Sequence, residues 1–146
     1  MSERVVATTN STQNEGDMSS THLNQFQDNL DKDIRVEVYH FHGDRQCSSC
    51  IAIGALAEKT VNTYFQNELK SGKLVFDHIN YDDFVNGDIA SKYDVKASSL
   101  WIGTYVGGKF HKGENTRVWY KINDEKDYLQ YLKGVIDKRL SGDLSE

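Results

Sequence analysis

A strand, a cysteine pair and a long helical pattern follow one another between residues 35 and 70, and this succession limits the possible folds most strongly. Residues 35–42, RVEVYHFH, are mostly β-branched or aromatic, which is typical of a strand. From Ser48 to Lys70 apolar residues recur every three or four positions, which predicts a helix with one buried side. That side comprises Cys50, Ile53, Ala57, Val61, Tyr64 and Phe65. Gly72 suits a left-handed helix end, and a second strand follows at 74–79. This unit predicts two parallel strands joined by a right-handed crossover.

The second half of the chain completes a mixed sheet. A short helix is expected at 88–93 and a third strand at 99–106. The glycine pair 107–108 predicts a hairpin turn, so the fourth strand runs antiparallel, either at 109–111 or at 116–121. The last helix starts near Asn123 or Asp124 and ends at Gly142; its buried side comprises Tyr128, Leu132, Val135 and Ile136. The sequence therefore predicts an α/β fold with four strands flanked by helices.

The first 33 residues differ from the rest in composition. They are rich in Ser, Thr, Asn and Gln and have too few apolar side chains to offset the entropy of ordering. We expect a flexible tail at 1–33, in which Leu23, Phe26 and Leu30 have the spacing of a short docking helix, and one folded domain at 34–142.

The two cysteines, Cys47 and Cys50, are the only ones in the chain. Cys47 falls where the loop after the first strand meets the helix, and a thiolate there faces free N–H groups at the positive end of the helix dipole. Such an environment lowers a thiol pKa. Cys50 lies one turn further on, at a spacing that permits a disulfide. The interpretation is a redox pair, with Cys47 attacking and Cys50 resolving, for which we expect no cofactor.

Two alternatives stay open for the cysteines. His40 and His42 point to one face of the first strand, so His40, His42, Cys47 and Cys50 offer two nitrogens and two sulfurs to zinc or copper. Alternatively, the two thiols are buried small apolar groups without chemistry.

Three stretches resemble the thioredoxin superfamily: the strand leading into CSSC and a helix, IASKYDVKASSL before the third strand, and GGK at the hairpin. The overlap covers about residues 34 to 140. Three stretches, VYHFHGDRQCSSCIAI, ELKSGKLVFDHINYDD and SKYDVKASSLWIG, are similar to the ArsF-type family, small thioredoxin-like proteins associated with nitroreductase or arsenic-related functions. The resemblance implies a thioredoxin-like fold and thiol–disulfide exchange with a protein thiol, disulfide or reductase.

The chain departs from the superfamily pattern beside the cysteines. The family's cis-proline falls on Ser98, and the chain contains no proline. A cis bond before a residue other than proline costs about 3 kcal/mol, so we expect a trans peptide here. The resemblance implies substrate contacts at Ala97, through its backbone, and at Ser98. The family's buried carboxylate has no clear counterpart; of Tyr39, His40 and Phe41, only His40 titrates near neutral pH.

Bulk properties limit the partners. A net charge of −5 argues against nucleic acid, and no run of 18 apolar residues suggests a membrane span. We expect a monomer, cytoplasmic as the sequence stands. The alternative is an exported or membrane-anchored domain whose leader has been removed.

Overall fold

The structure, a computed structural model, describes residues 33–145, which form one compact unit from Ile34 onward. The expected tail at 1–33 and its helix through Leu23, Phe26 and Leu30 lie outside the described residues, apart from Asp33. The predicted limits of the folded domain, 34 and 142, therefore stay a prediction.

The elements follow the predicted order β-α-β-α-β-β-α, with one helix divided. The strands are β1 (Arg35–His42), β2 (Leu74–Asn80), β3 (Ser99–Val106) and β4 (Lys109–Glu114). The helices are α2 (Ser48–Tyr64), α3 (Gln66–Ser71), α4 (Gly87–Tyr93) and α5 (Glu125–Leu140), with short 3-10 turns η1 (Phe84–Asn86) and η2 (Arg117–Tyr120). The predicted bounds of the first and third strands are confirmed.

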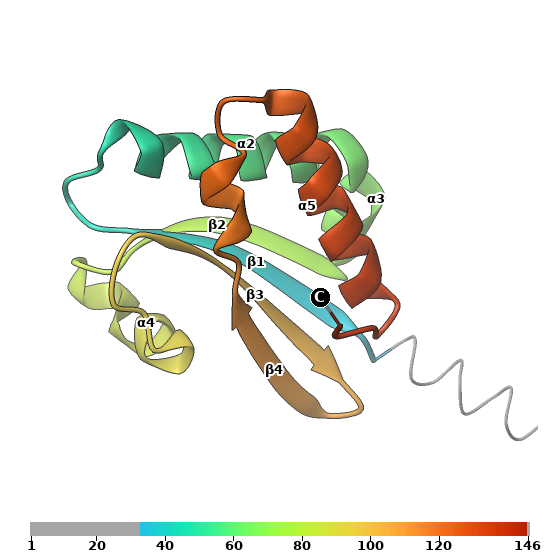
Figure 1. Cartoon of the computed structure of the whole chain (residues 1–146). Coiled ribbons are helices and arrows are strands. Elements are labelled where there is room, and N and C mark those ends of the chain that lie inside the picture. Colours follow the sequence, from blue (N-terminus) through green and yellow to red (C-terminus); the bar gives the residue numbers. More distant parts are fainter. Residues whose placement is uncertain (1–32, 146) are drawn as a thin grey trace, which may run out of the picture. The chain divides into compact units, whose positions relative to one another are not determined.

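The sheet has the strand order β2-β1-β3-β4. β1 and β2 are parallel, whereas β3 runs antiparallel to both β1 and β4. Helices α2, α3 and α5 lie on one face of the sheet and α4 lies on the other (Figure 1). This order of elements and strands is the thioredoxin-like fold.

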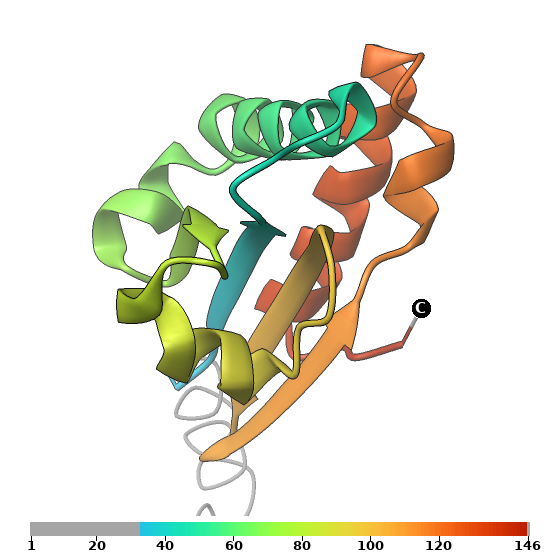
Figure 2. The same ribbon diagram turned by 90° about the vertical axis from the view of Figure 1, so that its left-hand side faces the viewer.

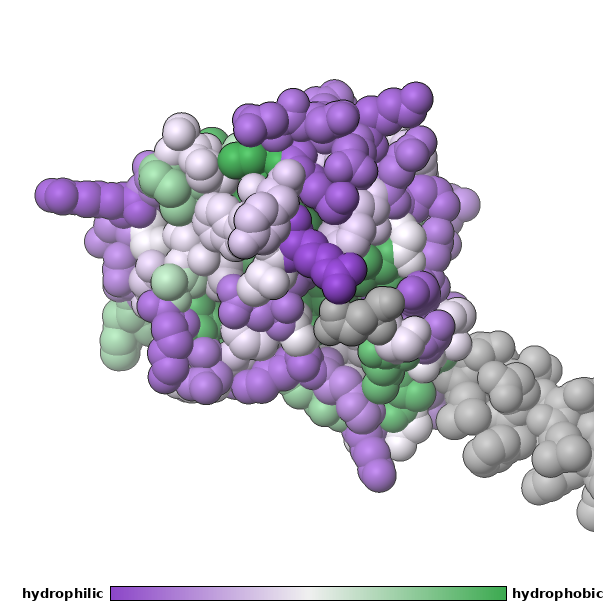
Figure 3. Space-filling view, viewed as in Figure 1, coloured by the Kyte–Doolittle hydropathy of each residue, from purple (hydrophilic) through white to green (hydrophobic). Residues whose placement is uncertain are grey.

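Alternation along β1 divides the interior into two cores. Val36 and Val38 are fully buried in the core below α2 and α5. Tyr39 and Phe41 belong to a second core, on the α4 side, where Tyr93 is also buried. His40 has the parity of the first set, because successive strand side chains point to opposite faces. The face of the molecule seen in Figure 3 is mostly hydrophilic, with hydrophobic residues in small separate areas.

The predicted single helix at 48–70 is wrong in one respect, because it breaks at Phe65. Phe65 leaves helical geometry with φ −130° and ψ 33°, and separates α2 from α3. The break buries the Phe65 ring, which is 3% exposed, and leaves Tyr64 40% exposed, although both were expected inside. Burying the Phe65 side chain against the core outweighs helix continuity. Gly72 then ends α3 in the predicted left-handed conformation, with φ 83°.

The fourth strand follows the hairpin directly. Gly107 and Gly108 have φ 58° and 79°, which is the turn geometry predicted for the glycine pair. Of the two expected positions, 109–111 is confirmed and extends to Glu114, whereas 116–121 contains η2 instead. Asp124 caps α5 by accepting a hydrogen bond from the Asp127 N–H at 3.1 Å.

Candidate functional site

The cysteines lie at the N-terminus of α2, as expected. Cys47 is the N-cap residue, and the Cys50 N–H points to its Sγ at 3.2 Å. The two residues form a disulfide, with their Cα atoms 5.0 Å apart. Cys47 is exposed and Cys50 is partly buried. A partner therefore reaches the Cys47 sulfur more easily than the Cys50 sulfur.

Hydrogen bonds to the end of β2 fix the loop that precedes Cys47. The Asp44 N–H donates to Asp82 Oδ2 at 2.8 Å, and the Asn80 side-chain amide donates to Asp44 Oδ1 at 2.8 Å. The Tyr81 N–H donates to the His42 carbonyl, also at 2.8 Å. The loop and the α2 N-terminus lie at the end of the sheet where β1 and β2 finish, and this end faces the viewer in Figure 2. The disulfide therefore stands on a connection with defined geometry.

Ala97 and Ser98 precede β3 at this same end of the sheet, because Ser99 pairs with Phe41 near the end of β1. None of the described peptide bonds is cis, so the Ala97–Ser98 bond is trans. The Ala97 carbonyl accepts a hydrogen bond from Ser99 Oγ at 2.8 Å, and Ser99 Oγ in turn accepts from Trp101 Nε1 at 2.9 Å. The backbone of Ala97, which the resemblance assigns to substrate contact, thus already has a hydrogen-bond partner inside the protein. Substrate contact at Ala97 and Ser98 stays a prediction.

His40 lies inside the protein, beneath α2. It is 2% exposed, and its ring packs so closely on Gly54 that a Cβ added there would lie 2.8 Å from His40 Cγ. Its Nδ1 is 2.9 Å from His78 Nδ1 on the neighbouring strand. Burial lowers the pKa of His40 to about 4, and His78 and His42 act in the same direction, whereas a backbone contact with Cys50 raises it.

Sequence reasoning missed the partners of His40. His78 faces His40 across the parallel β1–β2 pair, and its Nε2 is 2.7 Å from Glu58 Oε1 on α2. The residue patterns of β1 and β2 predict both strands but not the register in which they pair. Had the pairing of residues 40 and 78 been known, the histidine pair would have been visible in the sequence.

The four residues of the alternative metal site have other partners in this structure, which contains the disulfide. Within residues 33–145 no group of three or more His, Cys, Asp or Glu side chains is arranged to hold a metal ion. His42 Nδ1 contacts the Gly43 carbonyl at 2.8 Å, His40 pairs with His78, and both sulfurs are in the disulfide.

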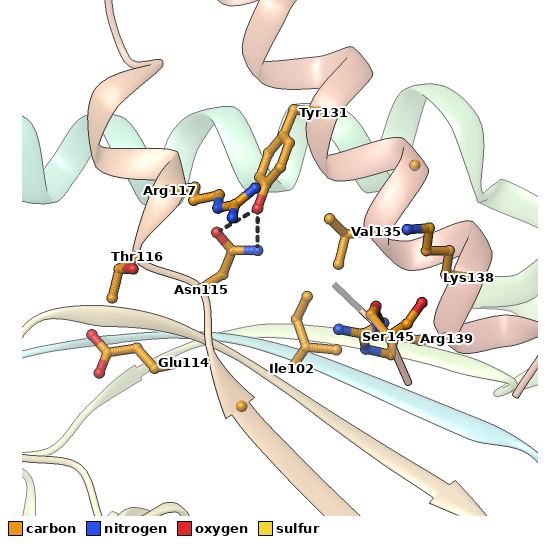
Figure 4. A pocket seen from close by; sticks show the side chains of 12 residues that line it. Ile102, Glu114, Asn115, Thr116, Arg117, Tyr131, Val135, Lys138, Arg139 and Ser145 are labelled. Carbon is orange, nitrogen blue, oxygen red and sulfur yellow. Dashed lines mark hydrogen bonds between the residues drawn. The ribbon is translucent and has the colours of Figure 1, made fainter. Parts of the chain in front are cut away.

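A hollow lies elsewhere, between β4 and α5. It has a volume of about 310 Å³, and neither cysteine lines it. Figure 4 shows Asn115 and Tyr131 joined at its rim, where the Asn115 amide donates to the Tyr131 hydroxyl at 2.9 Å. Arg139, also at the hollow, donates to the backbone carbonyls of Asp143 and Ser145.

No helix among the described residues is long and apolar enough to cross a membrane.

Comparison with known proteins yields structural likenesses only. No family model matches the chain, and no curated protein matches it. Thioredoxin O2 from Arabidopsis thaliana, in its oxidized state, superposes with a TM-score of 0.44 at 16% identity, over 82% of this chain and 88% of the other. Fasciola hepatica thioredoxin superposes with a TM-score of 0.39 at 22% identity, over 73% of this chain and 93% of the other. The zinc-bound form of human ERp44 gives 0.44 at 18%, over 73% of this chain and 28% of that one. The strand order and the order of the elements themselves identify the thioredoxin-like fold.

Proposed function

We propose that this chain is a thiol–disulfide oxidoreductase or electron carrier that uses Cys47 and Cys50 as its redox pair. The observation that carries the proposal is the disulfide at the N-terminus of α2, with the more exposed sulfur at the N-cap. Helix N-termini stabilise a thiolate through free N–H groups and the macrodipole, which makes the N-cap cysteine the better nucleophile. The resemblance of the surrounding stretches to the thioredoxin superfamily supports the same chemistry.

The reaction follows from the positions of the two sulfurs. In the reduced protein the Cys47 thiolate attacks a partner disulfide, forms a mixed disulfide and releases the first partner thiolate. Cys50 then loses its proton and attacks Cys47 Sγ, which closes the Cys47–Cys50 bond and releases the second partner thiolate. Two electrons pass from the protein to the partner, and the reverse sequence oxidises a partner dithiol. The partner is a protein thiol, disulfide or reductase.

Trapping with single cysteine variants tests these roles. Cys50→Ser is expected to hold a mixed disulfide with a model disulfide such as oxidised glutathione, whereas Cys47→Ser forms little of it because the remaining thiol is less exposed. Mass spectrometry of each variant after mixing reads the adduct directly. Wild-type protein is expected to gain two hydrogens on treatment with dithiothreitol. Equal and slow reaction of both thiols at neutral pH would refute the assignment of Cys47 as the attacking group.

A further inference from the structure

The hollow between β4 and α5 differs in charge from the protein as a whole. Its walls are residues 113–117, at and just after the end of β4, and the second half of α5. Its cationic residues are Arg117, Lys138 and Arg139, and Glu114 is the only carboxylate among the described residues that line it. The whole chain carries a net charge of −5. A mainly cationic hollow in an acidic protein favours an anionic ligand.

Two of the three cations have a structural explanation. Lys138 and Arg139 lie in the last turn of α5, where positive charge offsets the helix dipole. Arg139 Nη1 also donates to the carbonyls of Asp143 at 3.0 Å and Ser145 at 2.8 Å, which holds the segment after α5 against the hollow. Arg117 is different, because it is exposed on η2 and has no hydrogen bond or ion pair with another described residue. Arg117 is therefore the cation that a ligand can engage.

Hydrogen-bond donors lie beside Arg117. The side-chain oxygen of Asn115 accepts from the Val118 N–H at 3.3 Å, and one N–H of its amide donates to the Tyr131 hydroxyl at 2.9 Å. The second N–H of this amide and the hydroxyl of Thr116 have no partner within residues 33–145. Figure 4 shows Asn115, Thr116 and Arg117 at the same end of the hollow. A guanidinium next to two further donors suits a carboxylate, whose two oxygens only accept hydrogen bonds.

The middle of the hollow is apolar. Ile102 is 5% exposed and Val135 is partly buried, and Figure 4 shows both between the Arg117 end and the Arg139 end. Gly113 and Gly134 also line the hollow and contribute no side chain to fill it. The volume of about 310 Å³ equals about ten water molecules and lies at the low end for small-molecule sites. A ligand here is therefore small, with a compact apolar part.

The charge balance favours a single carboxylate over a phosphate. A phosphate monoester carries about −1.5 to −2 at neutral pH, which is more than the one guanidinium of Arg117 offsets. Glu114, in the same wall, adds repulsion that grows with the charge of the ligand.

We propose that the hollow between β4 and α5 binds a small organic monocarboxylate. Its carboxylate contacts Arg117 and the free N–H of the Asn115 amide. Its apolar part lies on Ile102 and Val135. Neither cysteine lines the hollow, so this binding does not depend on the proposed dithiol chemistry.

NMR titration of the full chain tests the site. Benzoate is the probe, and benzamide is its uncharged control of nearly the same shape. We expect benzoate to shift the amide signals of residues 113–117 and Gly134 saturably, with a dissociation constant of about 1 mM or tighter. Benzamide should bind at least about tenfold more weakly, because it loses the charge-assisted hydrogen bonds. Phenyl phosphate should bind more weakly than benzoate.

Three variants locate the binding. Arg117→Gln should weaken benzoate at least about tenfold and leave benzamide unchanged. Lys109→Gln removes the same charge from an exposed position on β4 outside the hollow, and should bind benzoate as wild type does. Gly134→Leu places a side chain in the hollow from α5 and should abolish binding of both probes. Circular dichroism of Gly134→Leu is expected to show a folded protein, because leucine favours a helix more than glycine does.

The possible results separate the parts of the proposal. Equal affinity for benzoate and benzamide, or an unchanged benzoate affinity in Arg117→Gln, would refute recognition of a carboxylate. Tighter binding of phenyl phosphate than of benzoate would refute the monocarboxylate assignment. No saturable shift at residues 113–117 would refute the site itself. Cys47→Ser should bind benzoate as wild type does, so failure of the dithiol function and failure of this site are observed separately.

Discussion

Gly54→Ala tests the close packing of α2 on His40. An added Cβ would lie 2.5 Å from Cε1 and 2.8 Å from Cγ of the ring, inside van der Waals contact. The ring is 2% exposed and hydrogen-bonded to His78, so it has little room to move. Overpacking of a core costs about 1–3 kcal/mol, and the rigid ring favours the upper end. Replacing glycine by alanine within a helix returns about 0.5–1 kcal/mol. We expect a net loss of about 2 kcal/mol in the free energy of unfolding.

The control for this substitution is Gly134→Ala in α5. Apart from its chain neighbours and the backbone of its own helix, no atom lies within 4 Å of a Cβ added at Gly134, so this variant keeps only the helical gain. We expect it to be more stable by about 0.5–1 kcal/mol. Urea unfolding followed by far-UV circular dichroism measures both variants under one set of conditions. Gly54→Ala as stable as wild type, beside a stabilised Gly134→Ala, would show that α2 and His40 are not in tight contact.

Two further predictions concern buried polar groups. Tyr93→Phe removes a hydroxyl that donates to Glu37 Oε1 at 2.8 Å inside the protein, and we expect a loss of about 1.5–3 kcal/mol by urea unfolding, as for other hydrogen bonds to charged groups; a change within experimental error would mean that Lys92 and Arg35 satisfy the carboxylate alone. Burial lowers the pKa of His40 from 6.5 to about 4, so the unfolded chain binds a proton that the folded chain does not. The contribution of neutral His40 to the free energy of unfolding is complete above pH 6.5. It is lost as the pH falls toward 4, by about 1.4 kcal/mol per pH unit. A pH series of unfolding measurements on wild type and His40→Gln should show this slope only in wild type.

The elements could largely be read from the sequence because their signals are local. β-Branched and aromatic residues marked β1, and glycines marked the end of α3 and the hairpin. The break at Phe65 was not predictable, since the apolar spacing continues through it and only packing decides which aromatic ring turns inward. The choice of β4 over residues 116–121 depended on the hairpin keeping its strands adjacent.

The candidate site divides in the same way. The spacing of Cys47 and Cys50, and their place after a strand and at a helix start, indicated that the two sulfurs could form a disulfide, which the structure contains. The groups beneath that helix could not be predicted, because His40 and His78 are 38 residues apart and meet only through the β1–β2 register. The internal hydrogen bond at Ala97 likewise depends on how Ser99 is oriented.

The sequence by itself determined which residues form the thioredoxin-like fold and where its two thiols stand. These follow from backbone preferences and from side chains within a few positions of one another. Only the tertiary structure decided what surrounds the thiols, including the burial of His40 and the contacts that join it through His78 to Glu58. The reason is physical: burial, register and hydrogen bonding between distant segments are properties of the packed chain, and no local pattern encodes them.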